Sequence, residues 1–155
     1  MEKKKYYLTK EGFKKLKEEF EKLKQLRLSK IQGEVPEYTH SDDLNVDYLI
    51  FWDDINLMER RIFELQEILR NCELIKAPKD KDVVSLGATV VVEIEGKEDE
   101  FTLVDSVEAN PLEGKISIES PVGKALLGKK IGEIVTVSSP FPIKYKIKKI
   151  KYLKD

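Results

Sequence analysis

Two stretches of the chain repeat apolar residues at alternating spacings of three and four, and this repeat constrains the fold more than any other feature. The members are Phe13, Leu16, Phe20 and Leu23 in the first stretch and Ile55, Met58, Ile62, Leu65 and Leu69 in the second. Such spacing puts one narrow apolar stripe on a helix, as in a coiled-coil seam. The sequence therefore predicts two helices packed through their stripes, either as an arm that reaches a partner or as half of a larger bundle.

The ends of these helices are marked by polar and helix-breaking residues. Thr9 is a suitable N-cap for the first helix, and Gly33 and Pro36 interrupt it. The second helix is expected to start at or near Ser41. Two helices joined by one loop form an antiparallel hairpin, and the roughly 28 residues 43–70 give an arm about 40 Å long.

Strand-like segments replace helical periodicity after residue 83. Their β-branched and alternating residues fall at 88–94, 100–104, 115–118, 133–137 and 143–147. One short helix is predicted between them, with Ser120 as N-cap, Pro121 in first position and Gly128 as its stop. The predicted fold class is α+β, with a two-helix coiled coil at residues 1–76, a linker at 77–82 and a small antiparallel-sheet domain with one short helix at 83–155.

Composition narrows the function classes. The 155 residues contain 28 Lys and Arg against 29 Asp and Glu, and this near balance argues against a dominant binder of free duplex DNA. Neither a signal peptide nor an apolar run of about 20 residues is present, so we expect a soluble cytoplasmic protein without a membrane partner. The single cysteine, Cys72, cannot form an intramolecular disulfide and is expected to be packed or half-buried.

Familiar enzyme signatures are missing. His40 is the only histidine, which excludes a Cys/His zinc site and a Ser-His-Asp triad. Glycine motifs that cradle phosphates are also absent. No classical enzyme signature is therefore found, and we expect no stably bound cofactor.

Carboxylates gather in the loop between the predicted helices, at Glu34, Glu37, Asp42, Asp43 and Asp47. Mg²⁺ prefers oxygen ligands, commonly one or two carboxylates with waters and phosphates, so this tip could complete a metal site in another protein. The alternative is that these carboxylates only stabilise a helix of this chain. Asp42 and Asp43 would lie in the first turn of the second helix, where the helix dipole favours a negative charge by about 0.3–1 kcal/mol.

Lysines are concentrated near the C-terminus, at Lys144, Lys146, Lys148, Lys149 and Lys151. The first three alternate with apolar residues and should share one face of a strand. That face could meet phosphates or an acidic protein. Alternatively, the lysines are a solvated row that discourages edge pairing.

With these elements in place, the chain resembles the GreA/GreB transcript cleavage factors over almost its whole length. The resemblance is carried by residues 7–16, 59–62 and 84–90, and most specifically by 116–129, Ile-Ser-Ile-Glu-Ser-Pro-Val-Gly-Lys-Ala-Leu-Leu-Gly-Lys. It implies an FKBP-like C-terminal domain that docks on bacterial RNA polymerase at the rim of the secondary channel. We expect Ser120, Pro121 and Gly123 to form the docking surface.

The resemblance also implies a mechanism. The coiled coil of such factors enters the channel, and acidic tip residues help to hold a second Mg²⁺ shared with the polymerase active site. Polymerase then cleaves the transcript 3′ end, which the factor touches only indirectly. If the roles of the family's tip residues apply at the matching positions of this chain, Asp43 and Asp42 are the catalytic carboxylates. Asp42, Asp43 and Asp47 are then the metal ligands. The factor would be a monomer and an accessory protein, not an enzyme.

The tip departs from the family pattern, which usually reads Gly-Asp-Leu-x-Glu-Asn-Ala-Glu-Tyr. Here Asp43-Leu44 is followed at once by Asn45-Val46-Asp47-Tyr48, so two residues are missing, including the second family carboxylate. Three functions stay open: a factor that stimulates cleavage, a channel occupant that inhibits or modulates polymerase, and an unrelated FKBP-like chaperone or binding module.

Overall fold

The computed structural model describes all residues except 1–2, 39–44, 139 and 154–155. Contacts between residues divide the chain into two compact units. The first comprises Met1–Lys4 and Phe13–Cys72, and the second comprises Lys5–Gly12 and Glu73–Asp155. The short N-terminal segment that leads into the first helix thus belongs with the C-terminal half of the chain.

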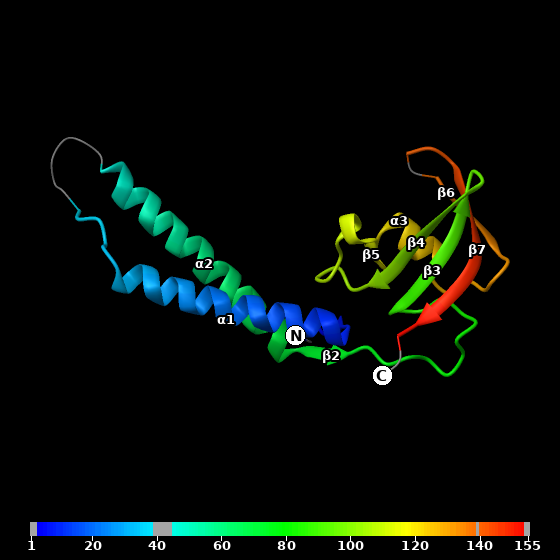
Figure 1. Ribbon diagram of the computed structural model, residues 1–155, viewed down its shortest axis with the longest axis horizontal. Coiled ribbons are helices and arrows are strands. Elements are labelled where there is room, and N and C mark those ends of the chain that lie inside the picture. Colours follow the sequence, from blue (N-terminus) through cyan, green and yellow to red (C-terminus); the bar gives the residue numbers. More distant parts are fainter. Residues whose placement is uncertain (1–2, 39–44, 139, 154–155) are drawn as a thin grey trace. The chain divides into compact units, whose positions relative to one another are not determined.

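The first unit is built on a pair of antiparallel helices, α1 (Lys10–Gln32) and α2 (Val46–Arg70) (Figure 1). Ion pairs join the two helices at three levels: Glu19 with Arg61 at 2.7 Å, Arg27 with Glu59 at 2.7 Å and Lys30 with Asp54 at 2.9 Å. As the residue number rises along α1, the number of the partner residue on α2 falls, as antiparallel packing requires. The predicted helical hairpin is confirmed.

Apolar side chains between the helices follow the two predicted stripes. Leu16, Ile55 and Leu65 are buried, and the other predicted members are half-buried. Phe51 and Ile68 are also buried, so the stripe on α2 extends one step closer to the loop than predicted. A pair of helices can bury only a narrow strip, and Leu26 and Leu28 beyond it are each 50% exposed.

Both ends of α1 agree with the sequence interpretation, whereas the start of α2 does not. The Thr9 hydroxyl accepts the Gly12 N–H at 2.9 Å, and Gly33 N–H closes the last turn of α1 on the Ser29 carbonyl at 3.0 Å. The start expected at Ser41 is wrong, because α2 begins at Val46 with Asn45 as its N-cap. Asn45 satisfies a backbone donor that would otherwise lack a partner at the helix end.

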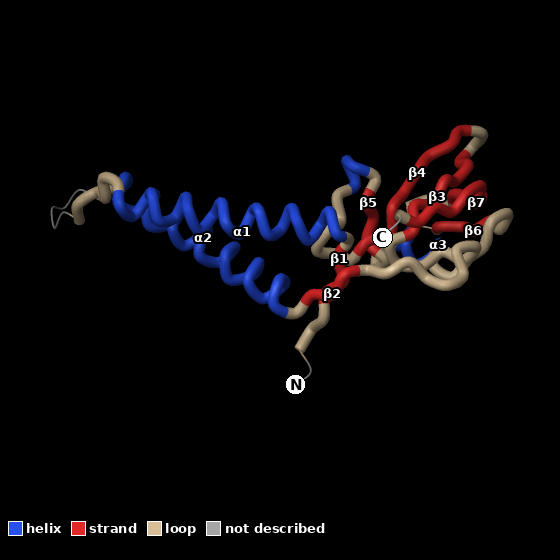
Figure 2. Tube along the Cα trace, turned by 60° about the horizontal axis from the view of Figure 1, so that its bottom comes forward, coloured by secondary structure: helices blue, strands red, loops and turns tan. Residues whose placement is uncertain are grey.

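The second unit contains a five-stranded sheet in the order β5-β4-β3-β7-β6. Its strands, shown in red in Figure 2 together with the short β1 and β2, are β3 (Ala88–Ile94), β4 (Lys97–Val104), β5 (Lys115–Ser117), β6 (Ile134–Val137) and β7 (Ile143–Tyr152). A short 3₁₀ helix, η1 (Pro111–Glu113), leads into β5, and α3 (Pro121–Leu126) follows it. The order of strands and short helix matches the α+β prediction.

Two features of the sheets differ from the prediction. The sheet is mixed, because β5 pairs in parallel with β4 while the other pairs are antiparallel. The connection from β4 through η1 brings the chain back in the same direction, so β5 cannot form a simple hairpin with β4. In addition, β1 (Tyr6–Leu8) and β2 (Cys72–Leu74) form a separate two-stranded sheet.

A β-bulge interrupts the pairing of β7 with β3. Val92 lies opposite Ile147 and Val91 opposite Lys149, so Lys148 is the extra residue. An extra residue shifts the alternation of side chains by one position. Ile150 and Tyr152 consequently return to the apolar face, where they pack against the core.

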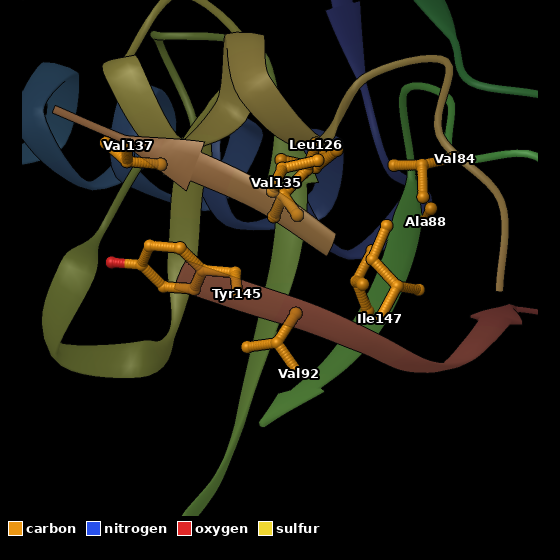
Figure 3. Packing of buried hydrophobic residues seen from close by; sticks show 10 residues of the cluster. Val84, Ala88, Val92, Leu126, Val135, Val137, Tyr145 and Ile147 are labelled. Carbon is orange, nitrogen blue, oxygen red and sulfur yellow. The ribbon is translucent and has the colours of Figure 1, made fainter. Parts of the chain in front are cut away.

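One face of the sheet carries the core of the second unit. Figure 3 shows side chains from β3, β6 and β7 around Leu126 of α3. Val90, Val92, Leu103, Leu126 and Ile147 are each fully buried. Together with Val84, Ala88 and Tyr145 they form one apolar cluster, which α3 covers. The opposite sheet face carries polar and charged side chains together with Val91 and Ile134.

Candidate functional site

The end of the hairpin holds the predicted carboxylates, of which Asp47 can be described in detail. Asp47 lies in the first turn of α2 and is exposed. Asp42, Asp43 and His40 lie outside the described residues. Because α2 begins at Val46, Asp42 and Asp43 precede the helix, and the alternative that placed them in its first turn is wrong. The favourable interaction with the helix dipole applies to Asp47 instead.

Asn45 fixes where the tip loop ends and α2 begins. Its side-chain oxygen accepts the Tyr48 N–H at 3.2 Å, and its amide nitrogen donates to the Glu37 carbonyl at 2.7 Å. One side chain thus caps the helix and ties it to the outgoing segment of the loop. Sequence reasoning missed this role, although an Asn directly before an apolar run with an acid at the second helical position is a recognisable N-cap signal.

Aromatic side chains accompany the carboxylates at this end of the hairpin. Tyr48 meets Tyr38 edge-on with ring centroids 5.3 Å apart, and it meets Trp52 at 6.3 Å. Phe51 packs edge-on against Trp52 at 5.2 Å and is itself buried between the helices. Edge-to-face contacts stabilise aromatic pairs beyond their buried area. The cluster stiffens the helix that carries Asp47.

The predicted docking residues surround the start of α3. The Ser120 hydroxyl accepts the Gly123 N–H at 3.1 Å and donates to the Ser117 carbonyl at 2.6 Å. Pro121 occupies the first helical turn and is exposed, where its missing N–H leaves no donor without a partner. The structure brings Ser120, Pro121 and Gly123 together at one corner of the second unit.

Gly123 has a structural role at this corner. It is buried, and a Cβ at this position would collide with the Ser117 carbonyl and lie 3.0 Å from the Ile118 Cα. Both neighbours are backbone atoms that cannot move aside cheaply. Any side chain at Gly123 would therefore disturb the packing of α3 on β5. Of the three predicted residues, Pro121 is the one that offers an exposed side chain to a partner.

The lysine cluster occupies a position other than the expected edge. β7 lies between β3 and β6, so its lysines do not protect the outer edge of the sheet. All five are exposed, including Lys149 and Lys151, which the sequence interpretation did not assign to the face of the first three. The adjacent pair Lys148-Lys149, which breaks the alternation, was the available signal of a bulge.

Several further expectations can be compared with the structure. Among the described residues, no group of three or more His, Cys, Asp or Glu is arranged to hold a metal ion. None of the described helices is long and apolar enough to cross a membrane. Cys72 is half-buried, as predicted, with its Sγ 3.4 Å from the Leu69 carbonyl oxygen, and burial raises the pKa of its thiol.

Comparison with known proteins gives the same result for both halves of the chain. Residues 6–74 match the family "Transcription elongation factor, N-terminal", and residues 79–152 match "Transcription elongation factor, GreA/GreB, C-term". The transcription elongation factor GreA of Clostridium acetobutylicum is 42% identical over 154 residues, which cover 96% of this chain and 98% of that protein. GreA of Halalkalibacterium halodurans is 42% identical over 144 residues, covering 90% and 91%.

Among solved structures, GreA factor homolog 1 of Thermus thermophilus aligns with this chain at 25% identity and a TM-score of 0.42. The alignment covers 96% of this chain and 99% of that one. The two family matches and the identity to GreA proteins exclude the alternative of an unrelated FKBP-like module. The chain belongs to the GreA/GreB family of transcription elongation factors.

Proposed function

We propose that this chain binds bacterial RNA polymerase at the secondary channel and stimulates cleavage of backtracked transcripts. Family membership supports a role in elongation. The single observation that carries the finer proposal is the hairpin end, where Asn45 and the aromatic cluster hold an exposed carboxylate, Asp47, at the start of α2. Asp42 and Asp43 directly precede this anchored point in the sequence.

The chemistry of these residues suits Mg²⁺. Carboxylate oxygens are the ligands that Mg²⁺ prefers, and it commonly takes only one or two of them from a protein. Asp42 and Asp43 would hold the ion jointly with polymerase, and Asp47 would support them from the helix. The bound Mg²⁺ would supply positive charge that favours attack of a water on the phosphodiester. This chain would add ligands, whereas polymerase would carry out the hydrolysis.

Docking is assigned to the second unit. Pro121 stands exposed on a corner made rigid by the Ser120 hydrogen bonds and by the close packing of Gly123 on the β5 backbone. A rigid corner loses little conformational entropy on binding, which favours a stable contact. In this role the chain is an accessory factor, as a monomer, and the transcript 3′ end is an indirect partner.

A second function, inhibition without cleavage, is favoured by one specific observation. The tip has two residues fewer than the family pattern and lacks its second carboxylate, and α2 starts only after Asn45. A factor that enters the channel without enough ligands would occupy it and block other factors. Both functions predict polymerase binding, so binding alone does not separate them.

The experiment is transcript cleavage in stalled, backtracked complexes of the cognate polymerase, with and without the full-length chain. Release of short 3′ fragments that depends on the chain supports stimulation. The same assay is repeated with an active cleavage factor present. If the chain releases no fragments and suppresses the other factor in proportion to its concentration, inhibition replaces stimulation. If it does neither and does not bind polymerase, both proposals are wrong.

A further inference from the structure

Helix α2 carries a second stripe of residues on a side that does not face α1. Its members repeat at the same alternating spacing of three and four as the stripe that packs on α1: Val46, Ile50, Asp53, Leu57 and Arg60. We call these five residues the outer stripe. The 3.6-residue period places it roughly 140° around the helix from the stripe that packs on α1. All five side chains of the outer stripe are exposed.

The apolar members of the outer stripe leave a large part of their surface in solvent. Val46, Ile50 and Leu57 are 57%, 54% and 58% exposed. Leu49 and Phe63 are exposed as well and flank one side of the stripe. A single exposed apolar residue needs no explanation, whereas several on one face of a helix are typical of an interaction site. Within the described part of the chain, this face has no cover.

The two charged members of the outer stripe lack ion-pair partners within the chain. Four other charged residues of α2 form ion pairs: Asp54, Glu59, Arg61 and Glu64. Among the described residues, Asp53 and Arg60 form none. They lie on either side of Leu57 and carry opposite charges. Reversing the direction of the stripe therefore exchanges the two signs, so the stripe is complementary to its own reverse.

A second copy of this chain matches the outer stripe when its α2 runs antiparallel. With Asp53 of one copy level with Leu57 of the other, Arg60 of the second copy lies about 4.5 Å further along the axis. The long Arg60 side chain spans that distance, so two Asp53–Arg60 pairs form around the two-fold axis. A parallel pairing would place like charges side by side. A two-fold contact must be self-complementary, and the outer stripe meets this requirement only in the antiparallel arrangement.

We infer that two copies of this chain associate through their outer stripes, with the two α2 helices antiparallel. The helices overlap over residues 46–64, about 28 Å, and a contact of that length buries less than the roughly 1,200 Å² at which standard interfaces begin. The dimer is therefore weak, with a micromolar or higher Kd. It is a resting form, because two paired hairpins do not enter a channel that admits one. This last role, unlike the dimer itself, rests on the proposed function.

Sedimentation equilibrium of the full-length chain, without polymerase, tests the association. Wild type should shift reversibly from monomer to dimer between about 1 and 500 µM. Leu57→Lys puts a charge at the centre of the contact and should raise the Kd of the dimer at least about 30-fold. The matched control is Leu26→Lys, which makes the same change at a leucine of α1 that is 50% exposed and outside the outer stripe. It should leave the Kd within about twofold of wild type.

Charge exchange tests which residues pair and in which direction. Asp53→Arg and Arg60→Asp, each alone, create two like-charged pairs across the contact and should raise the Kd at least about tenfold. An equal mixture of the two variants restores opposite charges in both pairs and should dimerise within about threefold of wild type. The double variant Asp53→Arg/Arg60→Asp keeps the wild-type net charge and should recover equally. Unchanged circular dichroism of each variant confirms that the fold is retained.

The resting role has its own measurement. At concentrations where the mixture of the two charge variants is mostly dimeric, it should bind polymerase at least about threefold more weakly than either variant alone, because only monomers are available. Normal dimerisation with unchanged polymerase binding would overturn the resting role. Since sedimentation uses no polymerase, failure of the dimer is distinguishable from failure of the cleavage function.

The dimer itself is overturned by any of three results. A wild-type chain that stays monomeric up to about 500 µM lacks the contact. A dimer that tolerates Leu57→Lys, or that the mixed charge variants fail to restore, uses another surface or direction. If wild type is monomeric and Leu57→Lys weakens polymerase binding while Leu26→Lys does not, the outer stripe is a contact for polymerase instead.

Discussion

The carboxylate of Glu108 fills the space that a Cβ at Gly12 would need. Glu108 follows β4 in the chain, and it accepts the Thr9 N–H at 3.1 Å and a hydrogen bond from the Thr9 hydroxyl. The nearby Asp105 accepts the Tyr7 N–H at 3.1 Å. Two carboxylates from one loop thus hold the segment that leads into α1. The missing side chain of Gly12 leaves room for the Glu108 carboxylate.

This relationship predicts strong coupling between the two positions. Gly12→Ala alone should change the free energy of unfolding little, because the loss of the Glu108 cap, about 0.5–2 kcal/mol, offsets the better helix propensity of Ala, about 0.5–1 kcal/mol. Glu108→Ala alone should destabilise. In the Glu108→Ala background, Gly12→Ala should stabilise, since nothing remains to displace. Urea unfolding of the four proteins measures the coupling, and additive effects within about 0.3 kcal/mol would contradict it.

The N-cap of α2 gives a second prediction. Asn45→Ala removes the acceptor for Tyr48 N–H and the donor to Glu37, so the hairpin should lose about 1–2 kcal/mol of stability. Asn45→Asp keeps the acceptor and should fall between Ala and wild type. Trp52, the single tryptophan, lies one to two turns further along α2 and reports unfolding by its fluorescence. Asn56→Ala, at an exposed position inside α2, is the control and should cause no loss.

Sequence periodicity predicted the elements whose signals are local. The 3-4 repeat of α1 and α2 and the Ser120-Pro121 start of α3 are confirmed because burial of one helix face and capping of one helix end depend on residues a few positions apart. The same locality explains why the strand segments were found but their pairing was not. The parallel pairing of β5 with β4 is set by the path through η1, which no alternation of residues encodes.

The candidate site was predicted less completely, because its contacts join residues that lie far apart in the sequence. Glu108 caps Thr9 from 99 positions away, and a loop glutamate carries no pattern that points to a distant helix. Gly123 was recognised as part of a specific segment, but its burial against the β5 backbone depends on tertiary packing. The start of α2 was predicted too early, because Ser and Asn are equally good N-cap residues and Ser41 comes before Asn45 in the chain. Side-chain type alone could not choose between them.

The bulge in β7 gives a third prediction. Deletion of Lys148 and Lys149 together removes both residues of the bulge, so that Ile150 follows Ile147 directly. Ile150 and Tyr152 then turn toward solvent, and loss of their burial should destabilise the second unit by more than about 3 kcal/mol. Tyr152 would also lose its hydrogen bonds to Ser85 and Val83. Lys148→Ala keeps the bulge and should unfold close to wild type in a thermal melt. Equal melting of the deletion and of Lys148→Ala would show that the bulge does not set the alternation.

Docking through the α3 corner gives a fourth prediction. Pro121→Glu introduces bulk and negative charge at an exposed first-turn position, where the helix dipole tolerates a carboxylate. The melting temperature should therefore change little, while affinity for polymerase should fall at least tenfold in a binding titration. Pro111→Glu is the matched control, because Pro111 is likewise exposed at the start of a helical turn, in η1. If the control weakens binding as much, the corner is not the docking surface.

The tip carboxylates give the last prediction, and it separates a metal role from a structural one. Asn has the shape of Asp without the charge, so Asp43→Asn should abolish most stimulation of cleavage and Asp42→Asn should reduce it strongly. Neither change should alter stability through the helix dipole, since both residues precede α2. Asp47→Asn should act the other way: a modest effect on cleavage and a loss of about 0.3–1 kcal/mol in hairpin stability, because Asp47 lies in the first turn.

The measurements are transcript cleavage at saturating factor and unfolding followed by Trp52 fluorescence, with polymerase affinity recorded for each variant. Affinity should stay constant, because docking is assigned to the other unit, so a drop in cleavage then reports the tip alone. If Asp47→Asn proves the most damaging change, the ion is held from the helix and the assignment of Asp43 is wrong. If wild type does not cleave but competes with an active factor, the shortened tip lacks a necessary ligand, and inserting Gly-Glu between Leu44 and Asn45 should then restore cleavage.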